Sequence, residues 1–418
     1  MIKLLTLSDS GVPSGYGRIH DHLMTALHKR GYEIWAASLQ WDGLLPPVYE
    51  GQRLPFWVSS LGGHDNWPEL FANLARALQP DLVLVIQDAP FAETARNLPL
   101  DWSKFGFVVV TPVDGKPILP QWVDVLKQAD GALSISQFGV DAHKERGISS
   151  LLCRPGIDPN VFYRLPEADR LAVRQKLSIA PDAFVVGSVA MNQGRKDVPH
   201  MMEAFFRFAQ DKPTARLLLN MEPQSPAGWD LPQLCQQWGW DDSQILWKRD
   251  CEQRGVIELR ERYNVMDAHM VIAHREGFGL PLVEAQACGV VSMALDWSSG
   301  PEICGEGYGL LVRPVDYFSY STWGGALDKH PDVNHMVELL QRMYDHPEER
   351  AAIARKGMER ARAWTWDGAV DNLVKVIERV MDKRRALPAP LQPPVRMPIV
   401  TMPNPDGLKA QTVELMEA

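Results

Sequence analysis

The sequence has few cysteines, and none of them are spaced to hold a metal ion. The five are Cys153, Cys235, Cys251, Cys288 and Cys304, an odd and scattered set. Neither a disulfide framework nor a cysteine zinc site is therefore indicated. We expect a protein of a reducing compartment, the cytoplasm.

Long apolar runs are also missing. No stretch reaches the roughly 18 consecutive apolar residues that a membrane-spanning helix needs. Residues 1–7 run directly into a glycine-containing turn, so we interpret them as a buried strand rather than as a signal peptide with a cleavage site. At most, peripheral contact with a membrane is expected.

An excess of positive charge is the third absence. Lysine and arginine number 43 against 52 aspartates and glutamates, which gives a formal net charge of −9 and a pI near 5.7. Such a surface has no general attraction for phosphate backbones, so the charge does not indicate a nucleic-acid partner. A local basic patch remains open.

What the chain does have is length and a repeating pattern of apolar residues. Its 418 residues, 45% of them hydrophobic, exceed the size of about 250 residues at which single cores stop growing, so two domains are expected. Short aliphatic runs alternate with segments of helical periodicity, which is typical of βα units and predicts an α/β fold with parallel sheets. The predicted strands form two groups, 2–7, 33–39, 81–86, 107–111 and 132–135, then 184–189, 215–220, 244–247, 270–273 and 290–295.

The two groups of strands predict two Rossmann-like, doubly wound domains that face each other. The turn-rich stretch 154–162 connects them, which gives a first domain at 1–165 and a second at 166–365. Apolar residues at helical spacing then predict a terminal helix at 366–385 that packs across both domains. Residues 386–418 are rich in proline and are interpreted as a flexible tail.

Two motifs suited to phosphate follow the first strand of each half. In residues 8–18, Gly15 and Gly17 stand at a helix start, where bare amides favour an anion such as a diphosphate. In residues 187–197, Arg195 and Lys196 form a basic pair that could neutralise a departing diphosphate. Alternatively, residues 8–18 form an ordinary turn between a strand and a helix, and Arg195 and Lys196 are a solvated basic pair without a ligand.

The third motif, residues 274–289, lies between a strand and a helix. Glu276 sits in the loop and Glu284 about one turn into the helix, so one carboxylate can meet a sugar and the other a ribose. Gly277 and Gly279 leave amides bare beside the helix start, where a diphosphate is stabilised. Alternatively, Glu276 and Glu284 are ordinary charged surface residues, but the glycines next to Glu276 disfavour this interpretation.

These motifs resemble the GT-B-fold retaining glycosyltransferases, specifically glycosyltransferase family 4 with its Glu-x7-Glu signature. Glu276 and Glu284 match that signature at its spacing. The stretch 154–162 resembles the family's hinge, 263–268 its preceding helix and 300–303 its following turn. The resemblance covers about residues 1–383.

The resemblance implies a fold and a reaction. The fold is the GT-B architecture, with an acceptor domain (1–165) and a nucleotide-sugar donor domain (166–365) facing across a cleft, and a C-terminal helix crossing back to the first domain. The reaction is a metal-independent, retaining transfer of a hexose-like unit from a UDP-, GDP- or ADP-sugar to a hydroxyl acceptor, without a further cofactor.

The resemblance also implies roles for particular residues. Glu276 holds hydroxyls of the transferred sugar and Glu284 the ribose, while Arg195 and Lys196 clamp the diphosphate. Asp114 occupies the place near the sugar where many relatives carry histidine, and it is expected to assist as a hydrogen-bond acceptor. The other donor-binding positions are Gly15, Gly17, Gly277, Phe278, Gly279 and Leu280.

Two departures from the family pattern stand out. The arginine that usually follows the glycine of the second-domain strand is replaced here by Val189 or Ala190, which leaves Arg195 to compensate. An aromatic insertion at 315–326 either lines a substrate or caps the domain.

The acceptor stays open on the sequence. A glycan, a lipid-linked sugar or a small metabolite is expected, and a hydroxylated nucleobase in DNA is an alternative. A nucleotide-sugar epimerase or hydrolase, and a non-catalytic nucleotide-sugar binding protein, are the alternatives to a transferase.

Overall fold

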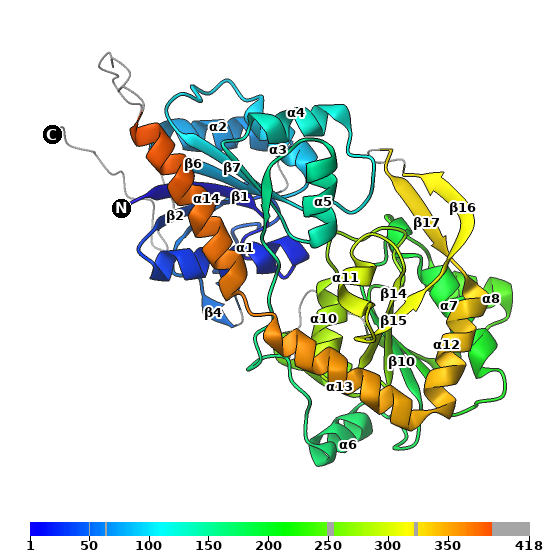
Figure 1. Ribbon diagram of the computed structural model, residues 1–418. Helices are drawn as coiled ribbons and strands as arrows, with labels where there is room; N and C mark the ends of the chain where they lie inside the picture. Colours follow the sequence, from blue (N-terminus) through cyan, green and yellow to red (C-terminus); the bar gives the residue numbers. More distant parts are fainter. Residues whose placement is uncertain (50, 63–64, 249–254, 322–324, 387–418) are drawn as a thin grey trace. The chain divides into compact units, whose positions relative to one another are not determined.

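The computed structural model describes residues 1–49, 51–62, 65–248, 255–321 and 325–386 (Figure 1). The chain divides into two compact units. Unit 1 comprises Met1–Thr111, Asp124–Ala132 and the chain from Asn372, and unit 2 comprises Pro112–Val123 and Leu133–Asp371. Within the described ranges, no helix is both long and apolar enough to cross a membrane. The predicted proline-rich tail falls almost entirely outside them.

Unit 1 is built on parallel strands whose order is β5-β2-β1-β6-β7. Their bounds are Trp57–Ser60 (β5), Glu33–Ser38 (β2), Lys3–Ser8 (β1), Leu82–Ile86 (β6) and Gly106–Thr111 (β7). The central strands β6 and β7 are buried along their whole length. Strands covered on both faces favour apolar residues at successive positions, which is why β6 is an uninterrupted aliphatic run and β7 contains three consecutive valines.

The last helix of the chain, α14 (Asp367–Arg385), packs on the strands of unit 1 (Figure 1). Gly106 and Gly131 leave room for it. A Cβ atom at Gly106 would stand 2.7 Å from Cγ1 of Val380, and one at Gly131 would stand 2.3 Å from Cγ1 of Val376. The predicted return of the terminal helix to the first half of the chain is therefore confirmed, since α14 is part of unit 1 from Asn372 onward.

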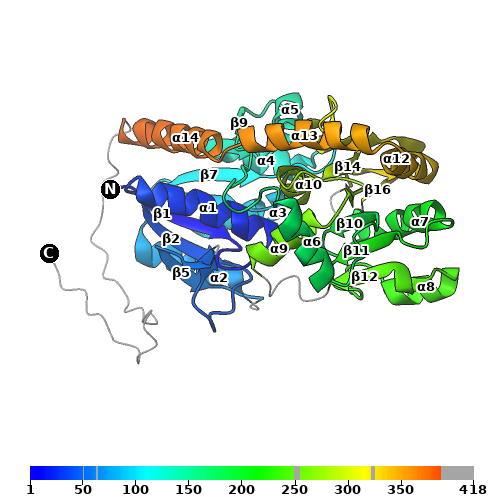
Figure 2. The same ribbon diagram turned by 90° about the horizontal axis from the view of Figure 1, so that it is seen from below.

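Unit 2 contains a six-stranded parallel sheet in the order β12-β11-β10-β13-β14-β15. The bounds are Ile245–Lys248 (β12), Arg216–Asn220 (β11), Val185–Val189 (β10), Ala268–Val271 (β13), Val291–Leu295 (β14) and Leu310–Val312 (β15). One hydrophobic cluster joins alternate residues of this sheet to three helices. Figure 2 shows where these helices lie. These are α7 (Val198–Ala209), α8 (Leu231–Trp238) and α12 (Val333–Asp345).

The other elements complete the two units. The remaining helices are α1 (Gly15–Lys29), α2 (Trp67–Leu78), α3 (Ala89–Arg96), α4 (Pro120–Gln128), α5 (Gln137–Glu145), α6 (Glu167–Lys176), α9 (Val256–Asn264), α10 (Leu280–Ala287), α11 (Gly300–Cys304) and α13 (Pro347–Ala363), with 3-10 turns η1 (Gly194–Lys196) and η2 (Asp242–Gln244). The remaining strands are β3 (Val48–Tyr49), β4 (Gln52–Arg53), β8 (Gly131–Ser134), β9 (Ser150–Leu152), β16 (Pro314–Tyr320) and β17 (Leu327–Pro331).

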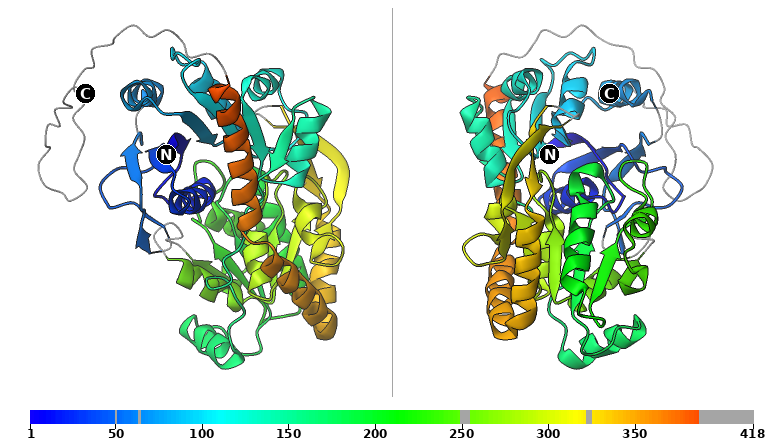
Figure 3. Two further views of the ribbon diagram at one scale, coloured as in Figure 1. Left: turned by 60° about the vertical axis from the view of Figure 1, so that its left-hand side comes forward. Right: turned by 90° about the vertical axis from the view of Figure 1, so that its right-hand side faces the viewer.

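All ten predicted strands are present, as β1, β2, β6, β7 and β8 and as β10 to β14. The first half of the aromatic insertion, residues 315–320, belongs to β16, which pairs antiparallel with β17 (Figure 3). Residues 322–324 of the insertion lie outside the described residues. Tyr317, Phe318 and Tyr320 are exposed, so these rings do not contribute to a core.

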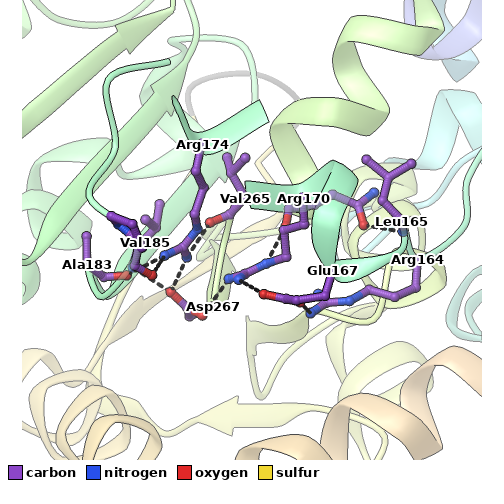
Figure 4. A network of polar contacts seen from close by, with 11 residues as sticks. Arg164, Leu165, Glu167, Arg170, Arg174, Ala183, Val185, Val265 and Asp267 are labelled. Carbon is purple, nitrogen blue, oxygen red and sulfur yellow. Dashed lines mark hydrogen bonds and ion pairs between the residues drawn. The ribbon is translucent and has the colours of Figure 1, made fainter. Parts of the chain in front are cut away.

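A buried ion network anchors α6 to the second sheet (Figure 4). Asp267 lies directly before β13. Its Oδ2 pairs with Arg174 Nη2 at 2.8 Å, and its Oδ1 pairs with Arg170 Nη2 at 3.1 Å. The backbone amide of Val185 donates to Oδ2 as well, at 2.9 Å. One carboxylate thus joins α6 to the starts of β10 and β13. The free-energy cost of burying the Asp267 carboxylate is offset by its two ion pairs and its hydrogen bond from Val185.

Candidate active site

The candidate site in unit 2 is centred on the loop between β13 and α10. Two serines of the segment after β14 hold this loop. The amide of Glu276 donates to Ser298 Oγ at 2.8 Å, and the same hydroxyl donates to the Glu276 carbonyl at 3.0 Å. Ser299 Oγ lies 2.8 Å from the carbonyl oxygens of both Glu276 and Phe278. The backbone of the loop is therefore fixed before any ligand arrives.

The Glu276 side chain faces the predicted basic pair. Its Oε2 forms an ion pair with Lys196 Nζ and lies 3.4 Å from Arg195 Nη1. Glu276 and Lys196 are 16% and 10% exposed. Both basic residues belong to η1, the turn that follows β10, so their position after a strand is as predicted.

Charge sets the protonation state of this cluster. Burial alone would raise the pKa of Glu276, but the charges of Lys196 and Arg195 outweigh it and lower that pKa to about 2. The pKa of Lys196 is lowered by burial and by the neighbouring Arg195 charge, with Glu276 acting against both. At neutral pH Glu276 is therefore an ionised carboxylate beside Lys196 and Arg195.

Arg195 reaches this site although Val189 and Ala190 occupy the usual arginine positions. Its Nη1 also donates to the carbonyl of Arg275 at 3.2 Å, so its guanidinium is held against the loop. The departure from the family pattern does not remove the second cation.

A further arginine, not singled out from the sequence, joins the cluster. Arg275 Nε lies 2.8 Å from Asp328 Oδ1 on β17 and 3.9 Å from Asp114 Oδ2. Asp114 is thus brought into the same part of unit 2 as Glu276, although it comes from the segment after β7. Its side chain is 38% exposed, so its carboxylate can meet a ligand.

The predicted glycines shape the start of α10. A Cβ at Gly277 would stand 2.7 Å from Cβ of Pro112, and Gly279 caps α10 at φ = +100°, where side chains are strained. Phe278 and Leu280 are buried, so these two can meet a ligand through backbone atoms only.

The second signature carboxylate lies inside unit 2. Glu284 is fully buried on α10, and its Oε2 accepts a 2.8 Å hydrogen bond from the hydroxyl of Tyr263 on α9. The structure brings Arg195, Lys196, Glu276 and Asp114 together around the β13–α10 loop, and it places Glu284 against Tyr263.

Gly15 and Gly17 belong to unit 1 and begin α1. Gly17 is required by packing, because a Cβ there would stand 2.1 Å from the Val12 carbonyl oxygen. Its amide donates to the N-cap Ser14 Oγ at 2.9 Å. A Cβ at Gly15 would meet no atom within 4 Å, so no packing contact explains that glycine.

Four contributors were missed in the sequence: Arg275, Ser298, Ser299 and Tyr263. Arg275 stands beside Glu276 in the sequence, and this adjacency is the one signal that could have found it. Ser298 and Ser299 lie in the loop after the next strand, β14, and no sequence spacing indicates that they hydrogen-bond to Glu276.

Comparison with known proteins gives named relatives. No protein-family model matches the chain. The D-inositol 3-phosphate glycosyltransferase of Stackebrandtia nassauensis is 29% identical over 243 residues, which are 56% of this chain and 49% of that protein. The chain spans about half the length of the curated relatives it matches.

Solved structures match almost the whole chain. Sucrose-phosphate synthase from Thermosynechococcus elongatus superposes with a TM-score of 0.72 at 19% identity, covering 92% of this chain and all (100%) of that one. HepE from Anabaena, solved in complex with UDP and glucose, gives 0.65 at 16% identity, covering 93% and 100%. With the parallel sheets of both units, these findings confirm the predicted fold. The chain therefore has the GT-B fold, and its sequence is similar to that of D-inositol 3-phosphate glycosyltransferases.

Proposed function

We propose that this protein transfers a hexose-like unit from a nucleotide-sugar to a hydroxyl acceptor, with retention of the anomeric configuration. The observation that carries the proposal is the ionised Glu276 held between Lys196 and Arg195 on a loop that leads into a helix. A carboxylate accepts hydrogen bonds from sugar hydroxyls, and two cations neutralise the diphosphate that departs.

In this proposal the ligand-free ion pair keeps both partners in place. The diphosphate takes over Lys196 and Arg195 as the donor binds, and Glu276 turns to the sugar hydroxyls. The amides at the start of α10 add the favourable end of the helix dipole. Gly15 and Gly17 of unit 1 are proposed to contact the phosphates as well, as the family resemblance implies.

Glu284 is the proposed partner of the ribose hydroxyls. Its buried carboxylate is positioned by Tyr263, so a ribose would meet a group whose orientation is already fixed. A preset acceptor loses little entropy on binding.

The proposed reaction needs no metal and no further cofactor. The acceptor hydroxyl attacks on the face from which the diphosphate leaves, and the leaving phosphate accepts its proton. Asp114 is placed to accept a hydrogen bond near the sugar. The reaction is accelerated because water is excluded and the two reactants are aligned.

Four properties stay predictions. They are the donor base, the acceptor, the domain boundaries at residues 165 and 365, and the cytoplasmic location. Relatives solved with UDP and glucose favour a UDP-sugar for the first trial. Among acceptors, a glycan, lipid-linked sugar or small metabolite comes before a hydroxylated base in DNA, because the chain carries a net charge of −9.

A thermal-shift screen tests the donor first. UDP, GDP, ADP and their common sugar conjugates are added at saturating concentration, and a ligand bound only by the native state must raise Tm. We expect a selective rise with one nucleotide. No rise with any of them would contradict the proposal.

Product analysis then separates the reaction classes. With donor and acceptor present, a transferase gives a glycoside of retained configuration. Free sugar or an epimerised donor formed without acceptor would indicate the hydrolase or epimerase instead, and binding without any product would indicate a non-catalytic protein.

A further inference from the structure

A cluster of three histidines and one aspartate lies in unit 2. Asp197 follows η1, His200 is on α7, His274 follows β13 and His330 is on β17. Asp197, His274 and His330 are far apart in the sequence, so no metal-ligand spacing indicates these three residues. The fold alone brings them together.

The distances within the cluster are short. His274 Nε2 lies 2.9 Å from Asp197 Oδ2, and the ring centroids of His274 and His330 are 4.2 Å apart. One ligand atom from each of Asp197, His274 and His330 can be chosen so that all lie within 4.8 Å of one another. Asp197 is buried and the two imidazoles are partly buried, unlike the exposed carboxylate groups common on surfaces.

We propose that Asp197, His274 and His330 bind one divalent transition-metal ion, with zinc as the ion that suits this ligand set. Zinc accepts imidazole nitrogens and carboxylate oxygens at about 2.0–2.2 Å and is commonly held by three protein ligands. Ligands at that distance on a tetrahedral ion are about 3.3 Å apart, a spacing that small side-chain rotations from the present distances reach.

Neighbouring groups orient the proposed ligands. His200 Nδ1 lies 2.7 and 2.8 Å from the two oxygens of Asp197, and Ser319 Oγ lies 2.9 Å from His330 Nε2. The Tyr317 ring packs on His330 at 5.1 Å between centroids. Metal ligands are typically fixed by such outer hydrogen bonds, which set the orientation and tautomer of each ring.

The protonation states also suit a cation. Burial and the neighbouring His274 lower the pKa of His330, which favours its neutral imidazole. Burial acts to raise the pKa of Asp197, but hydrogen bonds from His200 and His274 outweigh it, so the pKa is lowered and the carboxylate is ionised. A neutral imidazole and an ionised carboxylate are the forms that bind metals.

A bound ion would connect three segments of unit 2. Asp197 directly follows Lys196, and His274 stands two residues before Glu276, while His330 belongs to the aromatic hairpin. The ion would therefore fix the hairpin against the loops that carry the basic pair and Glu276. This role is structural and stands whether or not the protein transfers a sugar.

Calorimetric titration of the chelator-treated full-length chain with ZnCl₂ tests the proposal. We expect binding of one equivalent, with zinc retained through dialysis when measured by elemental analysis. His330→Ala and Asp197→Asn should lose this equivalent. Asparagine tolerates the positive φ of position 197 (50°), so the second variant changes the ligand without straining the backbone.

The matched control is His28→Ala, which removes an exposed imidazole from α1. It should bind one equivalent like the wild type. Far-UV circular dichroism of the metal-free variants shows that they fold, and zinc should raise Tm for wild type and His28→Ala alone. No stoichiometric binding by wild type, or unchanged binding by both folded ligand variants, would overturn the site.

Discussion

Lys196 Nζ and Glu276 Oε2 form an ion pair in which each side chain is at least four-fifths buried. The two residues come from different βα loops, one after β10 and the other after β13. Parallel strands place the loops at their carboxyl ends along one edge of the sheet, so neighbouring strands bring such residues into contact. The pair is thus a direct product of the strand order.

Replacing Glu276 tests the proposed sugar contact. Glu276→Ala should lower kcat of sugar transfer by about 100-fold or more, the scale seen when one stabilising group is lost. The change removes a loop carboxylate and no core volume, so the far-UV spectrum should stay the same. Glu338→Ala, on the exposed face of α12, is the control. Full activity of the Glu276 variant would refute the assignment.

The lowered pKa of Glu276 predicts a pH dependence of stability. A carboxyl whose pKa falls from 4.5 to about 2 on folding stabilises the protein above its unfolded pKa, and this contribution is lost as pH falls through the folded pKa. The full shift corresponds to about 3 kcal/mol. The free energy of unfolding of wild type should exceed that of Glu276→Gln above pH 4.5, and the difference should shrink towards pH 2. A difference that is constant over this range would contradict the ion pair.

The Tyr263–Glu284 hydrogen bond predicts a cost in stability. Tyr263→Phe removes the hydroxyl that donates to a fully buried carboxylate, so the free energy of unfolding should fall by about 1–3 kcal/mol. Urea denaturation measures it, with the exposed Tyr317→Phe as control. Nucleotide affinity should weaken too, and Glu284→Ala should weaken it further. Unchanged affinity in Glu284→Ala would remove its ribose role.

The ion network around Asp267 predicts the largest loss of stability. Asp267→Ala leaves Arg170 and Arg174 without their shared carboxylate, and breaking such a buried pair costs about 3–5 kcal/mol. Chemical denaturation should show this fall. Glu203→Ala breaks the exposed 3.2 Å pair with Arg207 and should cost under about 1 kcal/mol. Equal effects of the two variants would mean that the network adds nothing.

Several structural features were not predictable from local patterns. Strands β9 and β15 have three residues each, too few to display a period, and β5 is half exposed with a tryptophan at its start. The aromatic insertion lacks a strand's alternation, and its pairing with β17 depends on residues beyond the insertion. Short and edge strands form because neighbours are available, which a linear pattern does not contain.

The sequence by itself determined the ten principal strands, the α/β class and the loop positions of Glu276, Arg195 and Lys196. Parallel strands buried on both faces favour continuous aliphatic runs, and the turns after them favour glycine. Both features can therefore be recognised from short stretches of sequence. Only the tertiary structure decided that Arg275 meets Asp328, that Ser298 holds the Glu276 loop, and that Asp197 lies beside His274 and His330. These contacts join residues far apart along the chain, and their energies depend on distance and burial in space.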